Sequence, residues 1–162
     1  MAIIYLGLGS NIDPEDNLRL GIRELRRRYG ELRVSNVYKS ASVGFDGPEF
    51  LNLVVACEST ERPAEVHDQI ENIHQLAGRR RKDKRYSSRT LDIDLLLYGD
   101  LVTDEGPVRL PRSDVLRFSF VLRPLAELAP ELPHPVTKRT MAEHWQSFDF
   151  ASHPLTPVSV IL

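Results

Sequence analysis

The chain has 162 residues, a length that fits one domain with a single hydrophobic core. Hydrophobic residues make up 41% of it and charged residues 27%, the balance of an ordinary globular protein. The formal net charge of −2 argues against a protein that binds nucleic acid through its overall electrostatic field. We therefore expect a single domain over residues 1–162 that has no nucleic-acid partner.

The chain also lacks the usual patterns of membrane and secreted proteins. No apolar run approaches the ~20 residues that a membrane-spanning helix needs. The amino terminus enters a strand pattern at once, without the pattern of a signal peptide. Cys57 is the single cysteine, and its apolar neighbours favour a buried core residue over a nucleophile. We expect no membrane partner and a cytoplasmic location.

The first half of the chain alternates between strand and helix patterns. Asp13 suits the N-cap of a first helix, and Pro14 suits its first position. Apolar residues three and four apart form one stripe on each of two helices. The predicted elements are a strand at 2–9, a helix from Pro14 to Gly30, a strand at 32–38, a loop at 44–48, a strand at 50–57 and a helix from Pro63 to Gly78.

The second half begins with a basic run over residues 79–89, which holds seven positive side chains and one negative. An apolar strand follows, and the Gly99-Asp100 turn after it predicts a hairpin partner. The predicted elements are a strand at 92–97, its partner near 101–103, a helix at 120–128 despite Pro124, and a short helix at 141–148 within a weakly defined extension over 133–162. The order of elements predicts an α+β fold with a ferredoxin-like core, in which helices back an antiparallel sheet.

Asp92 and Asp94 open the apolar strand, so they point to the same face, with their Cα atoms roughly 6–7 Å apart. Two carboxylates at that separation can hold a hard cation, or bridge two cations about 3.5–4 Å apart. The alternative is a pair of strand-edge charges that neighbouring arginines neutralise. Aspartates at the start of a buried strand are costly unless a cation satisfies them, which favours the metal site.

The basic run lies directly before this acidic pair. Arg79, Arg81 and Arg89 bracket it, and arginine offers forked donors that match phosphate. The alternative is a solvated charged loop without a ligand. Acidic and basic groups this close together indicate a highly anionic guest such as a metal–nucleotide triphosphate. The chain has no P-loop motif, so side chains and metal would have to grip the phosphates.

Other candidate residues are weaker. His67, Glu71 and His74 stand at i, i+4 and i+7 of the second helix, a spacing that suits metal ligands, but a solvated helix face is the better interpretation. Phe50 and Phe120 could form flat walls for a flat ligand, and each alone is also typical of a core.

Together these motifs resemble the 6-hydroxymethyl-7,8-dihydropterin pyrophosphokinase family over about residues 4–132. Family members move the β,γ-pyrophosphate of ATP onto the hydroxymethyl group of the pterin, in folate biosynthesis, and give AMP. Several ordered matches at the right separations carry the resemblance: Leu8-Gly9-Ser10-Asn11, Phe50-Leu51-Asn52, Gly78-Arg79-Arg80-Arg81, Arg89-Thr90-Leu91-Asp92-Ile93-Asp94, and residues 120–130 around Arg123-Pro124-Leu125.

The resemblance implies a three-layer α/β/α arrangement and a role for each motif. Asp92 and Asp94 would bind two magnesium ions and be catalytic together with Arg81 and Arg89, which would hold the phosphates of the co-substrate ATP. The pterin would be sandwiched by Phe50 and Phe120 and contacted by Asn52, Ser40, Ala41 and Val43. The nucleotide side would comprise His74, Arg79, Arg81, Arg89, Arg112 and Arg117.

The chain departs from the family pattern mainly on the nucleotide side. Ser87-Ser88 replaces a usual Gly-Pro, Tyr86 a common tryptophan, and His74 a glutamate. Arg112 replaces a histidine that touches ATP, and a later loop arginine falls on Phe118, with Arg117 one place early. These departures leave open a diverged relative that binds a pterin or nucleotide with weak turnover. The order of elements and the basic loop leave open a second alternative, an RNA-binding module on the same core. A monomer is expected.

Overall fold

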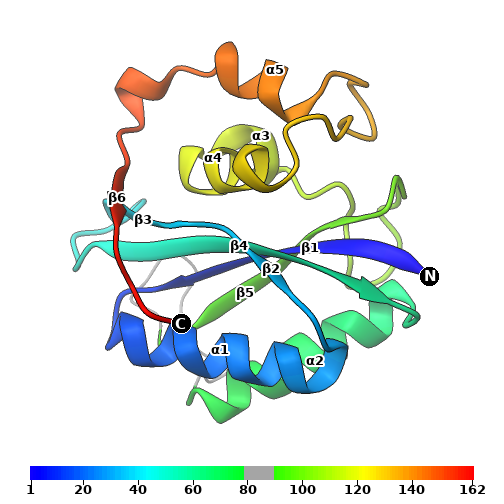
Figure 1. The fold of residues 1–162 in the computed structure, drawn as a ribbon, viewed down its shortest axis with the longest axis horizontal. Helices are drawn as coiled ribbons and strands as arrows, with labels where there is room; N and C mark the ends of the chain where they lie inside the picture. The colour runs from blue at the N-terminus through cyan, green and yellow to red at the C-terminus, as the bar shows by residue number, and fades with distance from the viewer. Residues whose placement is uncertain (79–89) are drawn as a thin grey trace.

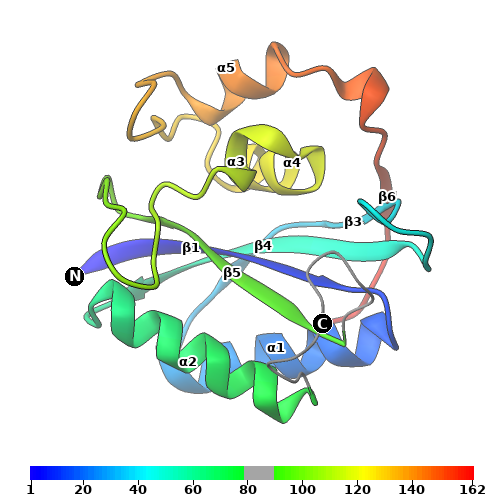
Figure 2. The same ribbon diagram turned by 180° about the vertical axis from the view of Figure 1, so that it is seen from behind.

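An antiparallel sheet forms the middle layer of the protein, and the computed structural model describes residues 1–78 and 90–162. Helices cover both faces of the sheet (Figures 1 and 2). The elements in chain order are β1 (Ala2–Ser10), α1 (Pro14–Tyr29), β2 (Arg33–Val34), β3 (Val37–Ser40), β4 (Phe50–Ser59), α2 (Pro63–Leu76), β5 (Asp92–Tyr98), α3 (Asp114–Arg117), α4 (Ser119–Leu128), α5 (Met141–Gln146), the 3₁₀ turn η1 (Phe150–Ser152) and β6 (Thr156–Val158).

The strands lie in the order β5-β1-β4-β3-β6, with β2 also beside β4. All of these described pairings are antiparallel, and β1 and β4 are inner strands of the sheet. Helices α1 and α2 cover one face, while α3, α4 and α5 lie on the other side (Figure 1). This confirms the predicted ferredoxin-like core and its three layers.

The first core lies between the sheet and helices α1 and α2. Leu18, Ile22 and Leu25 form the predicted apolar stripe of α1 and are buried against the sheet. Gly21 lies on the same helix, and a Cβ there would meet the side chain of Leu8 at 3.0 Å, so glycine lets the helix approach β1 closely. Cys57 is buried in this core as predicted, and burial raises the pKa of its thiol to about 11.

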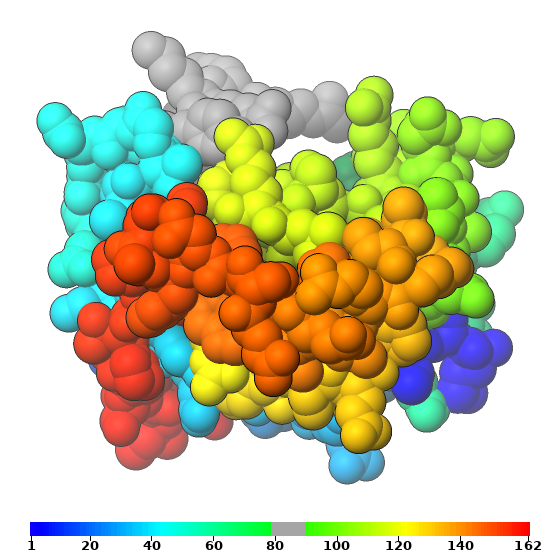
Figure 3. Space-filling view, turned by 90° about the horizontal axis from the view of Figure 1, so that it is seen from above, coloured from blue at the N-terminus to red at the C-terminus, as the bar shows by residue number. Residues whose placement is uncertain are grey.

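The second core lies between the opposite face of the sheet and helices α3, α4 and α5. The register of β5 against β1 shifts between Leu95 and Leu97, so the bulge turns both Leu96 and Leu97 toward this core. Leu122 and Leu125 of α4 are fully buried there. Figure 3 shows the segment that follows α4, drawn in orange, running across this side of the molecule.

One polar contact fixes helix α4 to the sheet. The carboxylate of Glu127 accepts a hydrogen bond from the Tyr38 hydroxyl at 2.7 Å and another from the Asn36 backbone N–H at 2.8 Å. Burial, and then the bond to Glu127, raises the pKa of Tyr38. The contact joins residues about ninety positions apart, and the sequence pattern did not predict it.

Several predicted elements need correction. The strand predicted at 32–38 is split into β2 and β3, because the Ser35 hydroxyl accepts the Val54 backbone N–H at 2.9 Å in place of a ladder bond. Asp13 occupies the N-cap of α1 but has a φ of 43° and makes no capping bond with its side chain. The hairpin partner of β5 near 101–103 is wrong, since Thr103 bridges Leu110 instead.

The C-terminal third contains more regular structure than the sequence predicted. Helix α3 was not predicted, and α5 ends at Gln146, earlier than expected. Strand β6 was also missed, because three exposed or half-buried residues with a proline among them carry little strand pattern. It pairs with β3 at the edge of the sheet, and Val158 and Leu162 pack against the first core.

Replacing Leu25 with alanine tests the first core. Because Leu25 is fully buried, Leu25→Ala should lower the free energy of unfolding by about 3 kcal/mol. The matched control is Leu76→Ala at an exposed position of α2, which should change it by less than about 0.5 kcal/mol. Urea denaturation measures both, and equal effects would contradict the assignment of the core.

Candidate active site

The acidic pair lies on the face of β5 that looks toward α3 and α4. Leu91, Ile93 and Leu95 are buried in the first core, whereas Asp92 and Asp94 alternate with them and are half-buried. The predicted common orientation of the two carboxylates is therefore confirmed. Burial of the apolar face of the strand therefore places the two carboxylates on the opposite face.

Strand β1 offers glycine beside each acid. Asp92 pairs with Gly9, and Asp94 pairs with Gly7. Gly9 also pairs with Asn52 on β4, and a Cβ at Gly9 would lie only 3.2 Å from the amide oxygen of Asn52. Glycine at this position therefore leaves room on the sheet between the acidic pair and Asn52.

Asn52 continues the same row across the sheet. It is buried, pairs with Tyr38 on β3, and donates its amide to the Ser40 hydroxyl at 2.8 Å and to the Tyr38 carbonyl at 3.2 Å. The structure thus brings together two of the predicted pterin contacts, Asn52 and Ser40. Asn52 is held in one orientation by these bonds.

The aromatic candidates each contact a second ring. Phe50 meets Phe45 edge to face, with ring centroids 6.4 Å apart. Phe120 is half-buried and stacks on Phe118, with centroids 4.9 Å apart and an interplanar angle of 17°. Packing of this kind restricts the rotation of a ring and so fixes the plane that it offers to a ligand.

The loop between β3 and β4 carries Ala41 and Val43, both exposed. The Pro48 carbonyl ties this loop down, because it accepts hydrogen bonds from the Asn11 side chain at 3.1 Å and the Ser42 hydroxyl at 2.7 Å. Asn11 belongs to the Leu8–Asn11 motif, so one role of that motif is to anchor this loop to the end of β1.

Among the described residues, Arg112 is a basic side chain that lies next to the acidic pair. Its Nη2 lies 3.4 Å from Asp94 Oδ1, and its Nε lies 3.3 Å from Asp114 Oδ2. Burial lowers the pKa of this guanidinium, but the attraction of Asp94, Asp114 and Asp92 outweighs that effect and raises the pKa above its usual value. The sequence analysis did not predict that Asp114 pairs with Arg112, although its position two residues later in the chain could have indicated it.

His74 is buried, so the expected solvated face is wrong for this residue. Its Nε2 accepts the backbone N–H of Ile93 at 2.9 Å, and its Nδ1 lies 3.3 Å from a carboxylate oxygen of Glu71. Ile93 separates the two aspartates along β5. The histidine therefore supports the strand that carries them, a role that helical spacing alone could not reveal because it depends on the neighbouring strand.

Arg117 makes a looser contact than Arg112. Arg117 is exposed, and its guanidinium lies 5.0 Å above the ring of the buried Phe118. That distance is in the range of a cation–π contact. Arg79, Arg81 and Arg89 lie outside the described residues.

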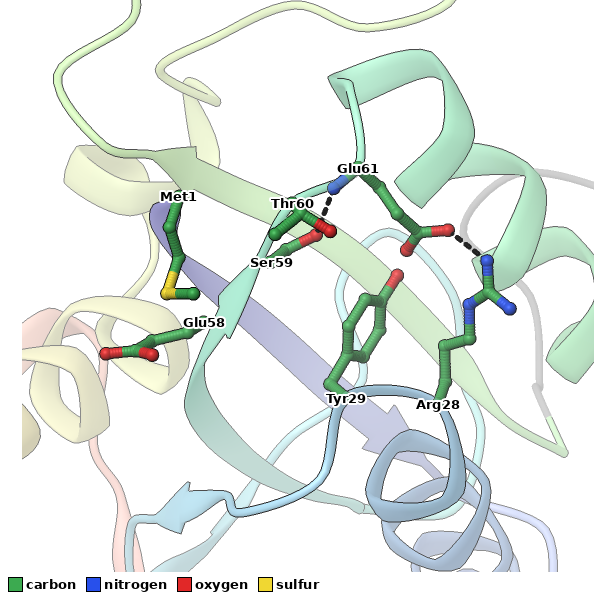
Figure 4. Close-up of a pocket in the computed structure, with 7 residues that line it drawn as sticks. All are labelled: Met1, Arg28, Tyr29, Glu58, Ser59, Thr60 and Glu61. Carbon is green, nitrogen blue, oxygen red and sulfur yellow. Dashed lines mark hydrogen bonds and ion pairs between the residues drawn. The ribbon is translucent and has the colours of Figure 1, made fainter.

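A separate pocket of about 240 Å³ lies at the opposite end of β1 and β4 from Asp92 (Figure 4). Arg28 forms an ion pair with Glu61 there, and the Tyr29 hydroxyl is directed at the same carboxylate. Burial, and then Glu61, raises the pKa of Tyr29 well above its usual value. Because this pocket is at the far end of the strands, it is distinct from the site at the acidic pair.

Two carboxylates on one face of a strand, with an arginine beside them, form a residue set that can hold divalent cations and phosphate groups. The comparison with protein families makes this specific. The model described as 7,8-dihydro-6-hydroxymethylpterin-pyrophosphokinase matches residues 5–130, and the chain belongs to this family.

Individual relatives agree with the family match. A 2-amino-4-hydroxy-6-hydroxymethyldihydropteridine pyrophosphokinase from Aquifex aeolicus is 32% identical over 145 residues, covering 88% of this chain and 90% of that protein. One from Pseudomonas aeruginosa is 36% identical over 137 residues, covering 82% of this chain and 83% of that protein.

Among the described residues, none of the helices has the length and apolar character to cross a membrane.

Solved structures show the same fold. The Plasmodium falciparum HPPK-DHPS with pterin and p-hydroxybenzoate has a TM-score of 0.72 at 14% identity, covering 90% of this chain and 42% of that one. An HPPK-DHPS in complex with substrates has a TM-score of 0.75 at 11% identity, covering 93% and 44%. This chain therefore spans less than half the length of those proteins.

Replacing His74 with alanine tests its support of β5. The backbone N–H of Ile93 would lose its acceptor, so the free energy of unfolding should fall by about 1–3 kcal/mol. The amide of Ile93 should also exchange faster with deuterium. His67→Ala on the same helix is the control and should leave that amide protected. Unchanged exchange at Ile93 in His74→Ala would refute the support.

Proposed function

We propose that this chain transfers the pyrophosphoryl group of ATP to the hydroxymethyl group of 6-hydroxymethyl-7,8-dihydropterin, giving AMP, in folate biosynthesis. It is thus an ATP-dependent diphosphokinase. The observation that carries this function is the acidic pair on the face of β5 opposite the first core, within the residues that the family model matches.

The acidic pair fits a pair of magnesium ions. Asp92 and Asp94 supply oxygen ligands from one face of one strand, and magnesium usually takes one or two carboxylates together with substrate phosphates. Within residues 1–78 and 90–162, no group of three or more acidic, histidine or cysteine side chains could hold a metal without such help. The remaining ligands of such ions would come from the phosphates and from water. Magnesium, when bound, supplies charge neutralisation at the phosphates.

The row of residues across the sheet fits the pterin. A fixed amide at Asn52 and a hydroxyl at Ser40 can recognise the polar edge of a flat heterocycle, and the loop with Ala41 and Val43 borders them. The rings of Phe50 and Phe120 would stack on its two faces. The bonds already made by Asn52 support this assignment, since a pre-oriented amide loses little entropy when a ligand binds.

The nucleotide would lie on the side of Arg112 and Arg117, and Arg79, Arg81 and Arg89 would hold its phosphates. Arg81 and Arg89 would act with the acidic pair in catalysis. His74 would serve the nucleotide side indirectly, because its bond to the Ile93 backbone holds the strand that carries the two aspartates. In the reaction, the pterin hydroxyl oxygen bonds to the β-phosphorus as the bond from that phosphorus to the bridging oxygen of AMP breaks, and the hydroxyl proton is lost. Such transfer depends on positioning and charge stabilisation rather than on a covalent intermediate.

We also propose a single domain over residues 1–162, a monomer, and a cytoplasmic location, which the use of ATP supports. Light scattering on a sizing column tests the monomer.

Product analysis tests the reaction itself. With ATP labelled at the α-phosphorus, magnesium and the hydroxymethyl pterin, the label should appear in AMP and an equal amount of pterin pyrophosphate should form. Omitting the pterin is the control and should leave ATP intact. ADP as the labelled product would contradict pyrophosphoryl transfer.

Changing the acidic pair tests the metal role. Asp92→Asn and Asp94→Asn should each lower kcat by about 10²–10³-fold, because a lost metal contact removes several kcal/mol of transition-state stabilisation. Asp100→Asn, an exposed aspartate in the turn after β5, is the matched control and should keep full activity. Wild-type turnover in Asp92→Asn would end the assignment of this pair.

A further inference from the structure

Arg112 is held at two separate points of its guanidinium. The Nη2 end faces Asp94, while the Nε edge faces Asp114 in the first turn of α3. Its backbone is also fixed, since the Arg112 N–H donates to the Leu96 carbonyl of β5 at 3.0 Å. The side chain thus starts from an anchored position two residues along β5 from Asp94.

The two contacts differ in kind. The Nε of Arg112 is buried and has no well-aligned hydrogen bond within the described part of the chain, although Asp114 lies close enough for an ion pair. The Asp94 contact joins an Arg112 side chain that is 38% exposed to an Asp94 side chain that is 29% exposed, so solvent reaches both partners. The Nη2 end can therefore change partners while Asp114 keeps the Nε edge in place.

A divalent cation at Asp94 would compete with this arrangement. The guanidinium lies 3.4 Å from the carboxylate oxygen, so it already supplies positive charge where the cation would bind. Two positive groups on one carboxylate repel each other, so each weakens the binding of the other. The competition ends when an anion such as a phosphate receives the guanidinium.

We propose that Arg112 is a positioning residue that serves as an exchangeable counter-ion of the metal site. It neutralises Asp94 in the protein without nucleotide and passes to a phosphate oxygen of ATP when Asp94 takes its divalent ion. Metal and nucleotide then bind as a coupled pair, and the metal alone binds weakly. This proposal rests on the proposed function, and it assigns to Arg112 a coupling role rather than only a phosphate contact.

Calorimetry with manganese tests the coupling without any turnover. Wild-type protein should bind Mn²⁺ weakly alone and more tightly with the α,β-methylene analogue of ATP. Arg112→Gln removes the charge at similar size, so it should bind Mn²⁺ alone about tenfold more tightly. Because coupling between two ligands is reciprocal, the enhancement by the analogue should shrink by about the same factor.

Three further variants complete the test. Arg109→Gln removes an exposed charge three residues earlier and should bind Mn²⁺ as the wild type does. Arg112→Lys keeps the charge and should also stay near the wild-type affinity. Asp114→Asn releases Arg112 toward Asp94, so it should weaken Mn²⁺ binding, and it keeps the proposal testable if Arg112→Gln does not fold.

The outcomes are separable. Equal Mn²⁺ affinity in wild type and Arg112→Gln, or a Mn²⁺ affinity in Asp114→Asn that is not reduced, overturns the exchange while leaving pyrophosphoryl transfer intact. Equal gains in Arg109→Gln and Arg112→Gln also overturn it, because a general field effect would then explain the result. Absence of Mn²⁺ binding in the wild type even with the analogue, together with absence of AMP formation, overturns both the exchange and the proposed function.

Discussion

The site depends on a strand that must be apolar on one face and acidic on the other. Leu91, Ile93 and Leu95 are buried against α1 and α2, and this burial holds β5 in register with β1. The alternation of a strand then obliges Asp92 and Asp94 to share the opposite face. A slip by one residue would bury both carboxylates, so the energy of the core also fixes the geometry of the acids.

Further contacts keep this strand and its surroundings in place. His74 accepts the amide of Ile93 from below, while Leu96 accepts the amide of Arg112 from the loop before α3. The bulge at Leu96 and Leu97 ends the acidic stretch, because it returns apolar side chains to the second core. These contacts fix the position of the acidic pair, and none of them requires a bound ligand.

Two residues that depart from the expected family pattern have structural partners in the fold. His74 stands where the resemblance led us to expect a glutamate and Arg112 where it led us to expect a histidine, yet each has defined partners in this protein. His74 is an internal support, and Arg112 is a charge held between two carboxylates. Both differences change the charge next to the acidic pair, whereas Gly9 and Asn52 keep the pattern.

The sequence by itself determined the main helices and strands and the common orientation of the acidic pair. Apolar spacing defined α1 and α2, and alternation placed Asp92 and Asp94 on one face, because these patterns depend only on neighbours along the chain. The motifs also identified the family. Short segments such as α3 and β6 carried too little periodicity to be predicted.

Only the tertiary structure decided which distant residues meet. His74 lies nineteen positions from Ile93, and Glu127 about ninety from Asn36 and Tyr38, so no local pattern could pair them. The same holds for the row from Asp92 through Gly9 to Asn52, which exists because three strands align. Such contacts arise when the sheet and its two helical layers come together, since burial and hydrogen bonding are then settled jointly across the whole chain.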